Sequence, residues 1–191
     1  MTMVGVPFAV MAIGFLLGSI PFGLLLTRMA GLGDIRAIGS GNIGATNVLR
    51  SGRRDLAAAT LILDAAKGTA AALLATRIGG DPSWAGLAAV LGHTLTPWLR
   101  FRGGKGVATG LGALTGIGWP LGLVACGVWL LAASVSRISS VAAICAFAVA
   151  GAAGVFDPAG MPVILLSAWV IYRHRANMGR LMAGTEPRIG K

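Results

Sequence analysis

Long apolar segments are the feature of this chain that most constrains its fold. Val4–Leu26 and Leu56–Ile78 each match the roughly 20 residues that an α-helix needs to cross a lipid bilayer. Of the 191 residues, 55% are hydrophobic and only 12% are charged, which is too apolar for a soluble domain. The sequence therefore predicts an all-α integral membrane protein in which residues 1–191 form a single membrane-embedded domain.

Further apolar segments bring the expected number of transmembrane helices to seven. They lie at Ser83–Leu99, in the two halves of Val107–Val135, at Val141–Phe156 and from Pro162 to Tyr172. Val107–Val135 is too long for one ordinary span, and Gly116–Pro120 predicts a tight turn that divides it into two short helices. A five-span arrangement, with the short segments re-entrant, would leave the same loops on the same side.

The basic residues predict which side of the membrane each loop occupies. Of the 16 Lys and Arg residues, 14 fall within residues 27–55, 100–105, 137–140 and 173–191. Because cytoplasmic loops carry an excess of Lys and Arg, this pattern predicts an N-terminus outside and a cytoplasmic C-terminus. No Lys or Arg precedes Val4–Leu26, so we interpret this segment as a retained helix rather than a signal peptide.

Ionisable residues lie deep within two of the apolar segments. Asp64 and Lys67 are three residues apart, so they share one face of a helix and are expected to pair in the protein interior. The pair either orients helices or takes part directly in a site, and both interpretations stay open. His93 lies about two helical turns before the basic loop at 100–105. It is either a hydrogen-bonded packing residue or part of a substrate site.

The segment Gly39–Arg50 has the composition of an anion-binding loop. Its glycine and alanine residues allow backbone N–H groups to approach an anion closely, and Arg50 adds a planar cation. Its polar side chains, which offer further hydrogen bonds, are Ser40, Asn42, Thr46 and Asn47. Two other basic loops, Arg102–Gly106 and Arg173–Asn177, fall on the same predicted side. Together the loops predict an anion pocket beside apolar helices, suited to a phosphate head with a fatty tail or to two substrates of opposite solubility.

Several other functions do not fit the pattern. The positive-inside bias accounts for the net charge of +10, and a chain with one tyrosine lacks aromatic platforms for nucleic-acid bases. Gly39–Gly44 matches the GxGxxG of dinucleotide-binding proteins, but its flanks are a loop and a membrane span rather than an α/β unit. Gly104-Lys105 lacks the first glycine and the Ser or Thr of a P-loop. Neither His93 nor His174 starts the His-x4-Asp pair of soluble acyltransferases, and no Ser-His-Asp arrangement is evident.

Four motifs, in their order and spacing, resemble one family of bacterial membrane enzymes. They are GSGNIGATNVLR at Gly39–Arg50, LDAAKG at Leu63–Gly68, Gly92-His93 followed by FRGGKGVAT at Phe101–Thr109, and RHRAN at Arg173–Asn177 continuing through Arg180-Leu181 to Gly184-Thr185-Glu186. Because these motifs extend over essentially the whole chain, the sequence is similar to the bacterial acyl-phosphate-dependent glycerol-3-phosphate acyltransferase family (PlsY).

The resemblance implies a seven-helix protein of the bacterial inner membrane whose active site faces the cytoplasm. The implied reaction transfers an acyl chain from acyl phosphate to the 1-hydroxyl of glycerol 3-phosphate. It gives 1-acyl-glycerol 3-phosphate (lysophosphatidic acid) and phosphate, as the first acylation step of phospholipid biosynthesis. Because acyl phosphate is an activated mixed anhydride, the reaction implies no cofactor, metal, coenzyme A or covalent enzyme intermediate. The expected partners are the two substrates and membrane lipids, without nucleic acid, and we expect a monomer.

The resemblance also implies roles for individual residues. Those implied to hold the phosphate-bearing groups are Ser40, Arg50, Lys105, His174 and Asn177. Those implied to shape the first loop are Gly41, Asn42, Gly44, Thr46 and Asn47. Thr46 and Ser139 would be hydrogen-bond partners near the reacting carbonyl, and those implied to support Lys105 are Arg102, Gly103 and Gly104. We expect the catalytic residues to be Lys105, Thr46, Ser139 and His174, and the others, with His93, to bind substrate. Either the departing phosphate or a histidine, His174 or His93, would be the base.

A membrane anion transporter and a scaffold protein are the alternative interpretations. A transporter would show internal repeats between its halves, but the three polar loops differ from one another and lie on one predicted side. A scaffold built from helix packing would not need loops so rich in Ser, Thr, Asn, Arg and Lys. The convergent polar groups therefore favour an enzyme.

Overall fold

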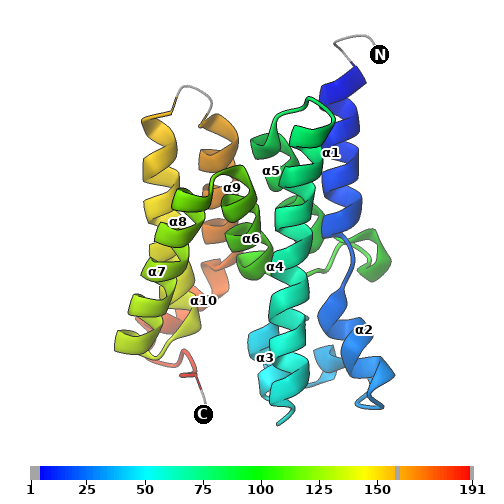
Figure 1. The fold of residues 1–191 in the computed structure, drawn as a ribbon. Coiled ribbons are helices and arrows are strands. Elements are labelled where there is room, and N and C mark those ends of the chain that lie inside the picture. The colour runs from blue at the N-terminus through cyan, green and yellow to red at the C-terminus, as the bar shows by residue number, and fades with distance from the viewer. Residues whose placement is uncertain (1–4, 158–159, 190–191) are drawn as a thin grey trace.

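Helices make up the regular structure in the computed structural model, which describes residues 5–157 and 160–189 (Figure 1). In chain order the elements are α1 (Gly5–Gly18), α2 (Phe22–Met29), η1 (Ile35–Ala37), α3 (Ala45–Leu49), α4 (Arg54–Arg77), α5 (Pro82–Thr94), η2 (Pro97–Leu99), α6 (Val107–Ile117), α7 (Trp119–Ser136), α8 (Ser139–Val155), α9 (Met161–Arg173) and α10 (Arg175–Met182). No strand occurs in the two described ranges. The all-α fold class is therefore confirmed.

Each apolar segment predicted to be helical contains a helix, and the predicted division of the longest run is confirmed. Gly118 separates α6 from α7, within the turn predicted at Gly116–Pro120. Pro120 lies in the first turn of α7, where its missing backbone N–H would have no partner within the helix.

Three helical stretches of the described chain are long and apolar enough to cross a membrane. They are Val6–Met29, Arg54–Arg77 and Trp119–Ser136. α6, α8 and α9 are apolar helices of 11, 17 and 13 residues. The number of spans therefore stays a prediction. Val4 and Pro158, which bound two of the predicted segments, lie outside the described residues.

The first apolar segment, predicted to be one helix, is two, because the chain breaks between α1 and α2 at Ser19–Pro21. The proline that ends this break has no N–H to continue the helix. Backbone groups freed inside a membrane need partners from the protein itself. The Thr96 hydroxyl and the Lys67 ammonium donate to the two freed carbonyls, of Ser19 and Ile20, at 2.7 Å each.

Glycines bring pairs of helices into close contact. A Cβ at Gly18 of α1 would lie 2.0 Å from the carbonyl oxygen of Ala89 in α5. A Cβ at Gly112 of α6 would lie 2.0 Å from the carbonyl oxygen of Ala65 in α4. No side chain fits at these distances, so glycine is required for the helix backbones to approach this closely.

Three buried clusters form the core, and two of them are large. The larger lies where α5, α6, α8 and α9 meet, and its fully buried members include Val90, Leu114, Phe147, Leu166 and Val170. The second lies against the first polar loop and includes Leu24, Ile35, Ile43 and Val48. This second cluster anchors a loop that has little regular structure of its own.

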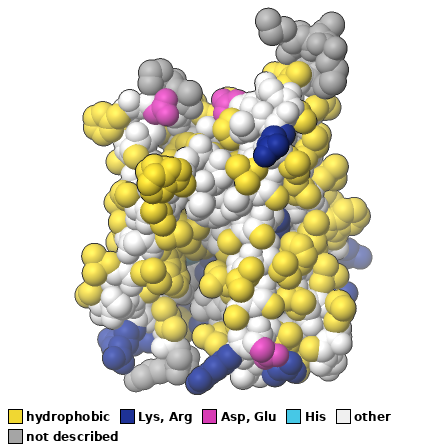
Figure 2. All heavy atoms as spheres, viewed as in Figure 1, with side chains coloured by type: hydrophobic (Ala, Val, Ile, Leu, Met, Phe, Trp, Pro, Cys, Tyr) yellow, Lys and Arg dark blue, Asp and Glu magenta, His cyan; other side chains and the backbone are white. Residues whose placement is uncertain are grey.

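Large apolar side chains also cover the outside of the bundle. Phe8, Ile62 and Leu131 are 78%, 65% and 67% exposed. Figure 2 shows hydrophobic side chains over the middle of one face, with Lys and Arg side chains gathered mainly at its lower end. Such a surface fits an apolar lipid environment and would be unusual in a soluble monomer.

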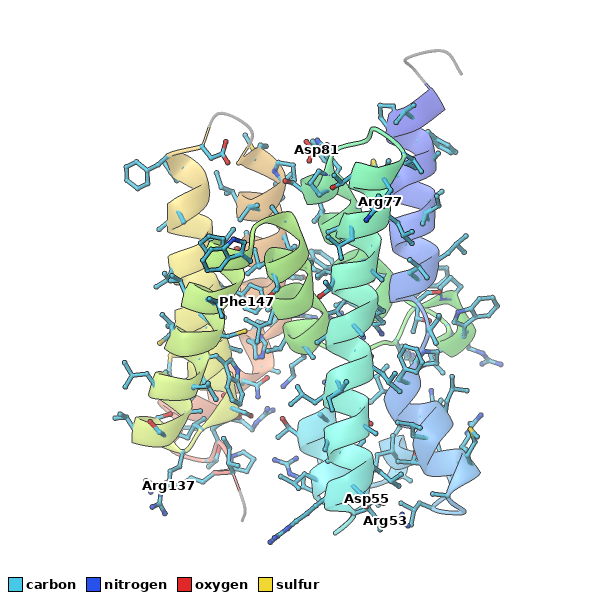
Figure 3. All side chains as sticks on the ribbon, in the orientation of Figure 1. Arg53, Asp55, Arg77, Asp81, Arg137 and Phe147 are labelled. Atoms are coloured by element: carbon cyan, nitrogen blue, oxygen red, sulfur yellow. The ribbon has the colours of Figure 1, made fainter. Side chains whose placement is uncertain are left out.

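The labelled charged residues lie at two opposite ends of the bundle. Figure 3 shows Arg53, Asp55 and Arg137 at the lower end, whereas Arg77 and Asp81 lie at the upper end. The loops with the basic excess at 27–55 and 137–140 are therefore on one side, as the sequence predicted. The identity of that side stays a prediction.

Candidate active site

Asn47 is the centre of the first polar loop. Its side chain is buried, and its Nδ2 donates to the backbone carbonyls of Ile35, Ile38 and Asn42 at 3.0, 3.1 and 2.8 Å. Its Oδ1 accepts hydrogen bonds from the backbone N–H and the hydroxyl of Ser40, at 2.9 and 3.2 Å. Both ends of the amide are thus occupied, so Asn47 shapes the loop from inside.

Other members of this loop leave polar groups accessible. Asn42 Oδ1 accepts from the backbone N–H of Gly44 at 3.0 Å, which fixes the chain just before α3. Gly39 has a φ of +58°, and a Cβ there would lie 2.9 Å from Cδ of Arg50, so the arginine packs directly on this glycine. The exposed members of the loop that were predicted to belong to the site are Ser40, Gly41, Thr46 and Arg50.

The second polar loop is held between two parts of the protein. The N–H groups of Gly103 and Gly104 donate, each at 3.1 Å, to the last two carbonyls of α5, those of Thr94 and His93. On the other side, Nη2 of Arg173 donates to the carbonyls of the same two glycines at 3.4 and 3.1 Å. The chain that leads into Lys105 is therefore fixed from both directions.

His93, predicted to bind substrate, is 4% exposed and lies beneath this loop. Its Nδ1 is 2.9 Å from Nζ of Lys67, which is in turn 2.6 Å from Oδ1 of Asp64. The pairing of Asp64 and Lys67 in the interior is thus confirmed, and His93 joins it. Lys67 also holds the backbone at the break in the first apolar segment. The cluster therefore joins α4, α5 and the break between α1 and α2.

Glu186, which the sequence analysis did not assign to the site, organises the third polar region. Its Oε1 accepts from the Ser140 hydroxyl at 2.8 Å and from the Asn177 amide, and its Oε2 accepts from Arg180 Nε at 2.7 Å. Burial opposes ionisation, but these hydrogen bonds keep the pKa of Glu186 below its usual value. A signal was present in the sequence, since Glu186 is the single acid in the basic tail 173–191.

Lys105 lies within the electrostatic reach of all these regions. Burial lowers its pKa to about 8, and the negative charge of Glu186 opposes this shift. The positive charges of Arg180, Arg50 and Arg173 lower the pKa of Lys105 further. The three basic loops therefore act on one half-buried ammonium, which a bound anion would stabilise.

His174 is buried between α9 and α10 and is neutral near pH 7. Burial is the main cause that lowers its pKa to about 4; the hydrogen bond with Val170 opposes the shift, and the charge of Lys105 adds to it. Its Nδ1 lies 2.8 Å from the Val170 carbonyl, which can only accept, so the proton is assigned to Nδ1 and the lone pair to Nε2. His174 is therefore suited to accept a proton rather than to hold phosphate as a cation.

Arg102 lies beside the first loop. It lines an open pocket of about 450 Å³ together with Asp34, Arg36, Ala37 and Gly41. Arg36 forms an ion pair with the Asp34 carboxylate at 2.5 Å. Arg102 takes part in none of the described ion pairs, so its guanidinium has no carboxylate paired with it in this pocket. The structure thus connects Arg102 with the first loop.

The remaining predicted site residues are less closely connected to Lys105. Asn177 is buried, and its Oδ1 has no hydrogen-bond partner in the described parts of the chain. Ser139 is the half-buried first residue of α8, and Thr46 is exposed on α3. Within residues 5–157 and 160–189, no hydrogen bond joins the side chain of Thr46 or Ser139 to Lys105.

Comparison with known proteins agrees with these features. The model of the glycerol-3-phosphate acyltransferase family matches residues 8–184. A glycerol-3-phosphate acyltransferase of Mesorhizobium japonicum is 56% identical over 181 residues, with 93% of each chain covered. One from Rhodospirillum rubrum is 55% identical over 192 residues, covering 93% of this chain and 88% of that protein.

Solved structures of an integral membrane glycerol 3-phosphate acyltransferase, PlsY, have the same fold. Its glycerol 3-phosphate form is 37% identical, with a TM-score of 0.86 and 96% of both chains covered. Its lysophosphatidic acid form is 35% identical, with a TM-score of 0.87 and coverage of 96% of this chain and 95% of that one. From the family match over nearly the whole chain, the identity to these relatives and the shared fold, this chain belongs to the PlsY family of integral membrane glycerol-3-phosphate acyltransferases.

Proposed function

We propose that this protein uses acyl phosphate as its donor and transfers the acyl chain to the 1-hydroxyl of glycerol 3-phosphate. The observation that carries this proposal is the half-buried Lys105, whose charge environment includes Arg50, Arg173 and Arg180. A donor and an acceptor that both carry phosphate require several cations around one centre. Acyl phosphate is already activated as a mixed anhydride, so orientation and charge stabilisation are sufficient to accelerate the transfer.

The proposed reaction is a single acyl transfer, in which one bond forms as another breaks. The 1-hydroxyl oxygen attacks the acyl carbonyl carbon, a new ester C–O bond forms, and the bond between that carbon and the phosphate oxygen breaks. The hydroxyl proton passes to the departing phosphate, which leaves as inorganic phosphate. His174 is the competing base, because its Nε2 carries a lone pair in the neutral form.

The side chains divide into those that bind phosphate and those that stabilise the reacting carbonyl. Lys105 and Arg50 supply the positive charge, and Thr46 and Ser139 donate to the carbonyl oxygen as negative charge develops on it. The groups assigned to substrate binding are Ser40, Gly41, Asn42, Gly44, Arg102 and Asn177. Asn47, Gly103 and Gly104 shape the loops that present these groups.

We also propose a monomer that spans the bacterial inner membrane seven times and forms one acyltransferase domain. The shorter helices α5, α6, α8 and α9 would cross as parts of the bundle. The end that carries Arg53 and Arg137 would face the cytoplasm, in keeping with the positive-inside rule (Figure 3). The site would then receive water-soluble glycerol 3-phosphate from that side and an acyl chain from the bilayer.

The test is release of inorganic phosphate by the purified full-length protein, given acyl phosphate with and without glycerol 3-phosphate and in the presence of a metal chelator. Release is expected to require glycerol 3-phosphate, to persist in chelator, and to be matched by formation of lysophosphatidic acid. Acyl-CoA is expected to fail as donor. Transfer from acyl-CoA in place of acyl phosphate would overturn the donor assignment, and no transfer from either would overturn the proposed reaction.

A further inference from the structure

The buried cluster of Asp64, Lys67 and His93 has a consequence for the loop that carries Lys105. The Lys67 ammonium donates to the Ile20 carbonyl at 2.7 Å and lies 2.6 Å from Asp64 Oδ1 and 2.9 Å from His93 Nδ1. An ammonium has N–H donors and no acceptor, so Lys67 donates to His93 Nδ1, which accepts. The imidazole is thereby fixed in orientation by a residue on another helix.

The opposite edge of the imidazole faces the second polar loop. A Cβ added at Gly104 would lie 2.0 Å from Nε2 of His93, and 2.9 and 3.0 Å from Cδ2 and Cε1. The three nearest atoms to this Cβ position are therefore all ring atoms of one side chain. The position of the His93 ring decides how close the backbone of Gly104 can lie to α5.

The loop needs such a constraint because glycine restricts the backbone least of all residues. Two glycines, Gly103 and Gly104, precede Lys105. Their N–H groups are bound by carbonyls of α5 and their carbonyls by Arg173. The His93 ring adds a fixed surface against which this segment packs, and so limits the position of the lysine that follows.

We propose that His93, held by Lys67 and Asp64, is a positioning residue that sets the path of the Gly103–Gly104 backbone and thereby the place of the Lys105 ammonium. This inference rests on the proposed role of Lys105 in acyl transfer. It differs from the predicted role of His93 in binding substrate, because His93 acts through the loop. It also gives the buried ion pair a function in the site besides joining helices.

The experiment makes room at the ring edge while keeping the contact with Lys67. In His93→Asn, the side-chain amide reaches the place of Nδ1 and retains a partner for Lys67, but the Cε1–Nε2 edge is removed. This substitution is combined with Gly104→Ala, whose methyl would otherwise collide with that edge. Acyl transfer to glycerol 3-phosphate, and thermal stability in detergent, are measured for the full-length wild type, both single variants and the double variant.

Gly104→Ala is expected to lower kcat about 100-fold, since a displacement of about 1 Å at a catalytic group can cost that much. His93→Asn is expected to lower kcat about 10-fold, with little change in thermal stability. The double variant is expected to be about 10-fold more active than Gly104→Ala, because the methyl group occupies the space left by the ring edge. Such recovery would not follow if His93 only stabilised the helix bundle.

Gly103→Ala is the matched control. Its Cβ would lie 2.0 Å from the backbone carbonyl oxygen of His93, a clash that no change of the His93 side chain removes. Adding His93→Asn to Gly103→Ala should therefore give no recovery. If His93→Asn does not yield folded protein, His93→Ala opens the same space and enters the same comparisons.

The proposal is overturned if the Gly104→Ala double variant is no more active than Gly104→Ala alone, or if both glycine variants recover equally. It is also overturned if His93→Asn raises KM for glycerol 3-phosphate without lowering kcat, as direct substrate binding would predict. Absence of transfer by the wild type would instead contradict the proposed function, so the two failures are distinguishable.

Discussion

The Ser140 hydroxyl donates to Oε1 of Glu186 at 2.8 Å, which joins the start of α8 to a tail residue 46 positions later. The backbone N–H of Ile189 also donates to the carbonyl of Arg137 at 2.7 Å, so the tail returns to the loop before α8. Glu186 raises the pKa of Lys105. The Glu186 carboxylate therefore has two effects: it holds the C-terminal tail against the start of α8, and it favours the charged form of Lys105.

Removing the negative charge of Glu186 should change both the thermal stability of the protein and the pKa of Lys105. Glu186→Gln is expected to lower the thermal unfolding midpoint by several degrees, because hydrogen bonds to a charged acceptor are worth about 1.5–3 kcal/mol each. It should also lower the pKa of Lys105, because a negative charge that favours the ammonium is lost. The decline of kcat/KM at alkaline pH should then begin at a lower pH than in the wild type.

Arg188→Gln supplies the control for Glu186→Gln. Arg188 is an exposed charged residue of the same tail that takes no part in the described ion pairs. It should leave both the unfolding midpoint and the alkaline decline close to those of the wild type. An unchanged pH profile in Glu186→Gln would show that Glu186 does not act on Lys105.

The pKa of Lys105 predicts the pH dependence of the wild type. The ammonium form is the one that binds phosphate, and in the free protein its pKa is about 8. Above that pH, kcat/KM should fall about tenfold per pH unit as the free protein loses the charge. A bound dianion favours the ammonium, so the decline of kcat should lie at higher pH than that of kcat/KM.

Two substitutions at Lys105 separate charge from position. Lys105→Arg keeps a cation that does not titrate in this range, so the alkaline decline should disappear even if the rate is lower. Lys105→Ala should lose about 100- to 1,000-fold in kcat, the usual cost of removing one group that stabilises transition-state charge. An alkaline decline that persists unchanged in Lys105→Arg would assign it to another group, and near-normal turnover in Lys105→Ala would contradict the anion-pocket proposal.

The helices were predictable because segment length and hydrophobicity are local properties. Gly118 and Pro120 give the division between α6 and α7 a local signal. The break at Ser19–Pro21 was not predicted, although it contains a proline. Its stability depends on Lys67 and Thr96, which are distant in sequence and supply the donors that the freed carbonyls need.

The site was predictable in composition and only partly in arrangement. Gly39–Arg50 and the loop Arg102–Gly106 were assigned to the candidate site because glycines, amides and cations in short loops have few other uses in an apolar chain. Glu186 was missed because its position as the single acid of a basic tail does not reveal that the fold brings Ser140 and Asn177 to it. The contact between Gly104 and the His93 ring likewise depends on how the loop folds back on α5.

Asn47 offers a test of the interior of the first loop. In Asn47→Asp the donating amide becomes an acceptor that faces three backbone carbonyls, whereas Asn47→Ala leaves those carbonyls without a donor. Each buried carbonyl without a partner costs about 1–3 kcal/mol, so both variants should unfold at lower temperature and lose most acyl transfer. Asn47→Asp should be the less stable, because repulsion adds to the missing bonds. Thr46→Val, at the exposed neighbouring position, is the control and should leave the unfolding midpoint nearly unchanged. Equal stability of Asn47→Asp and the wild type would contradict the proposed role of the Asn47 amide.

Substitution of His174 distinguishes the two candidate bases, which are the departing phosphate and His174 itself. If the departing phosphate accepts the proton, the acid decline of kcat/KM belongs to phosphate ionisation near pH 6 and should remain in His174→Gln, although the rate falls. If Nε2 of His174 were the base, the wild type should stay active down to its pKa of about 4, and His174→Gln should abolish that decline. Because the proposed reaction gives the proton to phosphate, we expect the first result. Measuring kcat/KM between pH 4.5 and 7 for both proteins checks it, and a wild-type profile that is flat above about pH 5 would assign the proton to His174 instead.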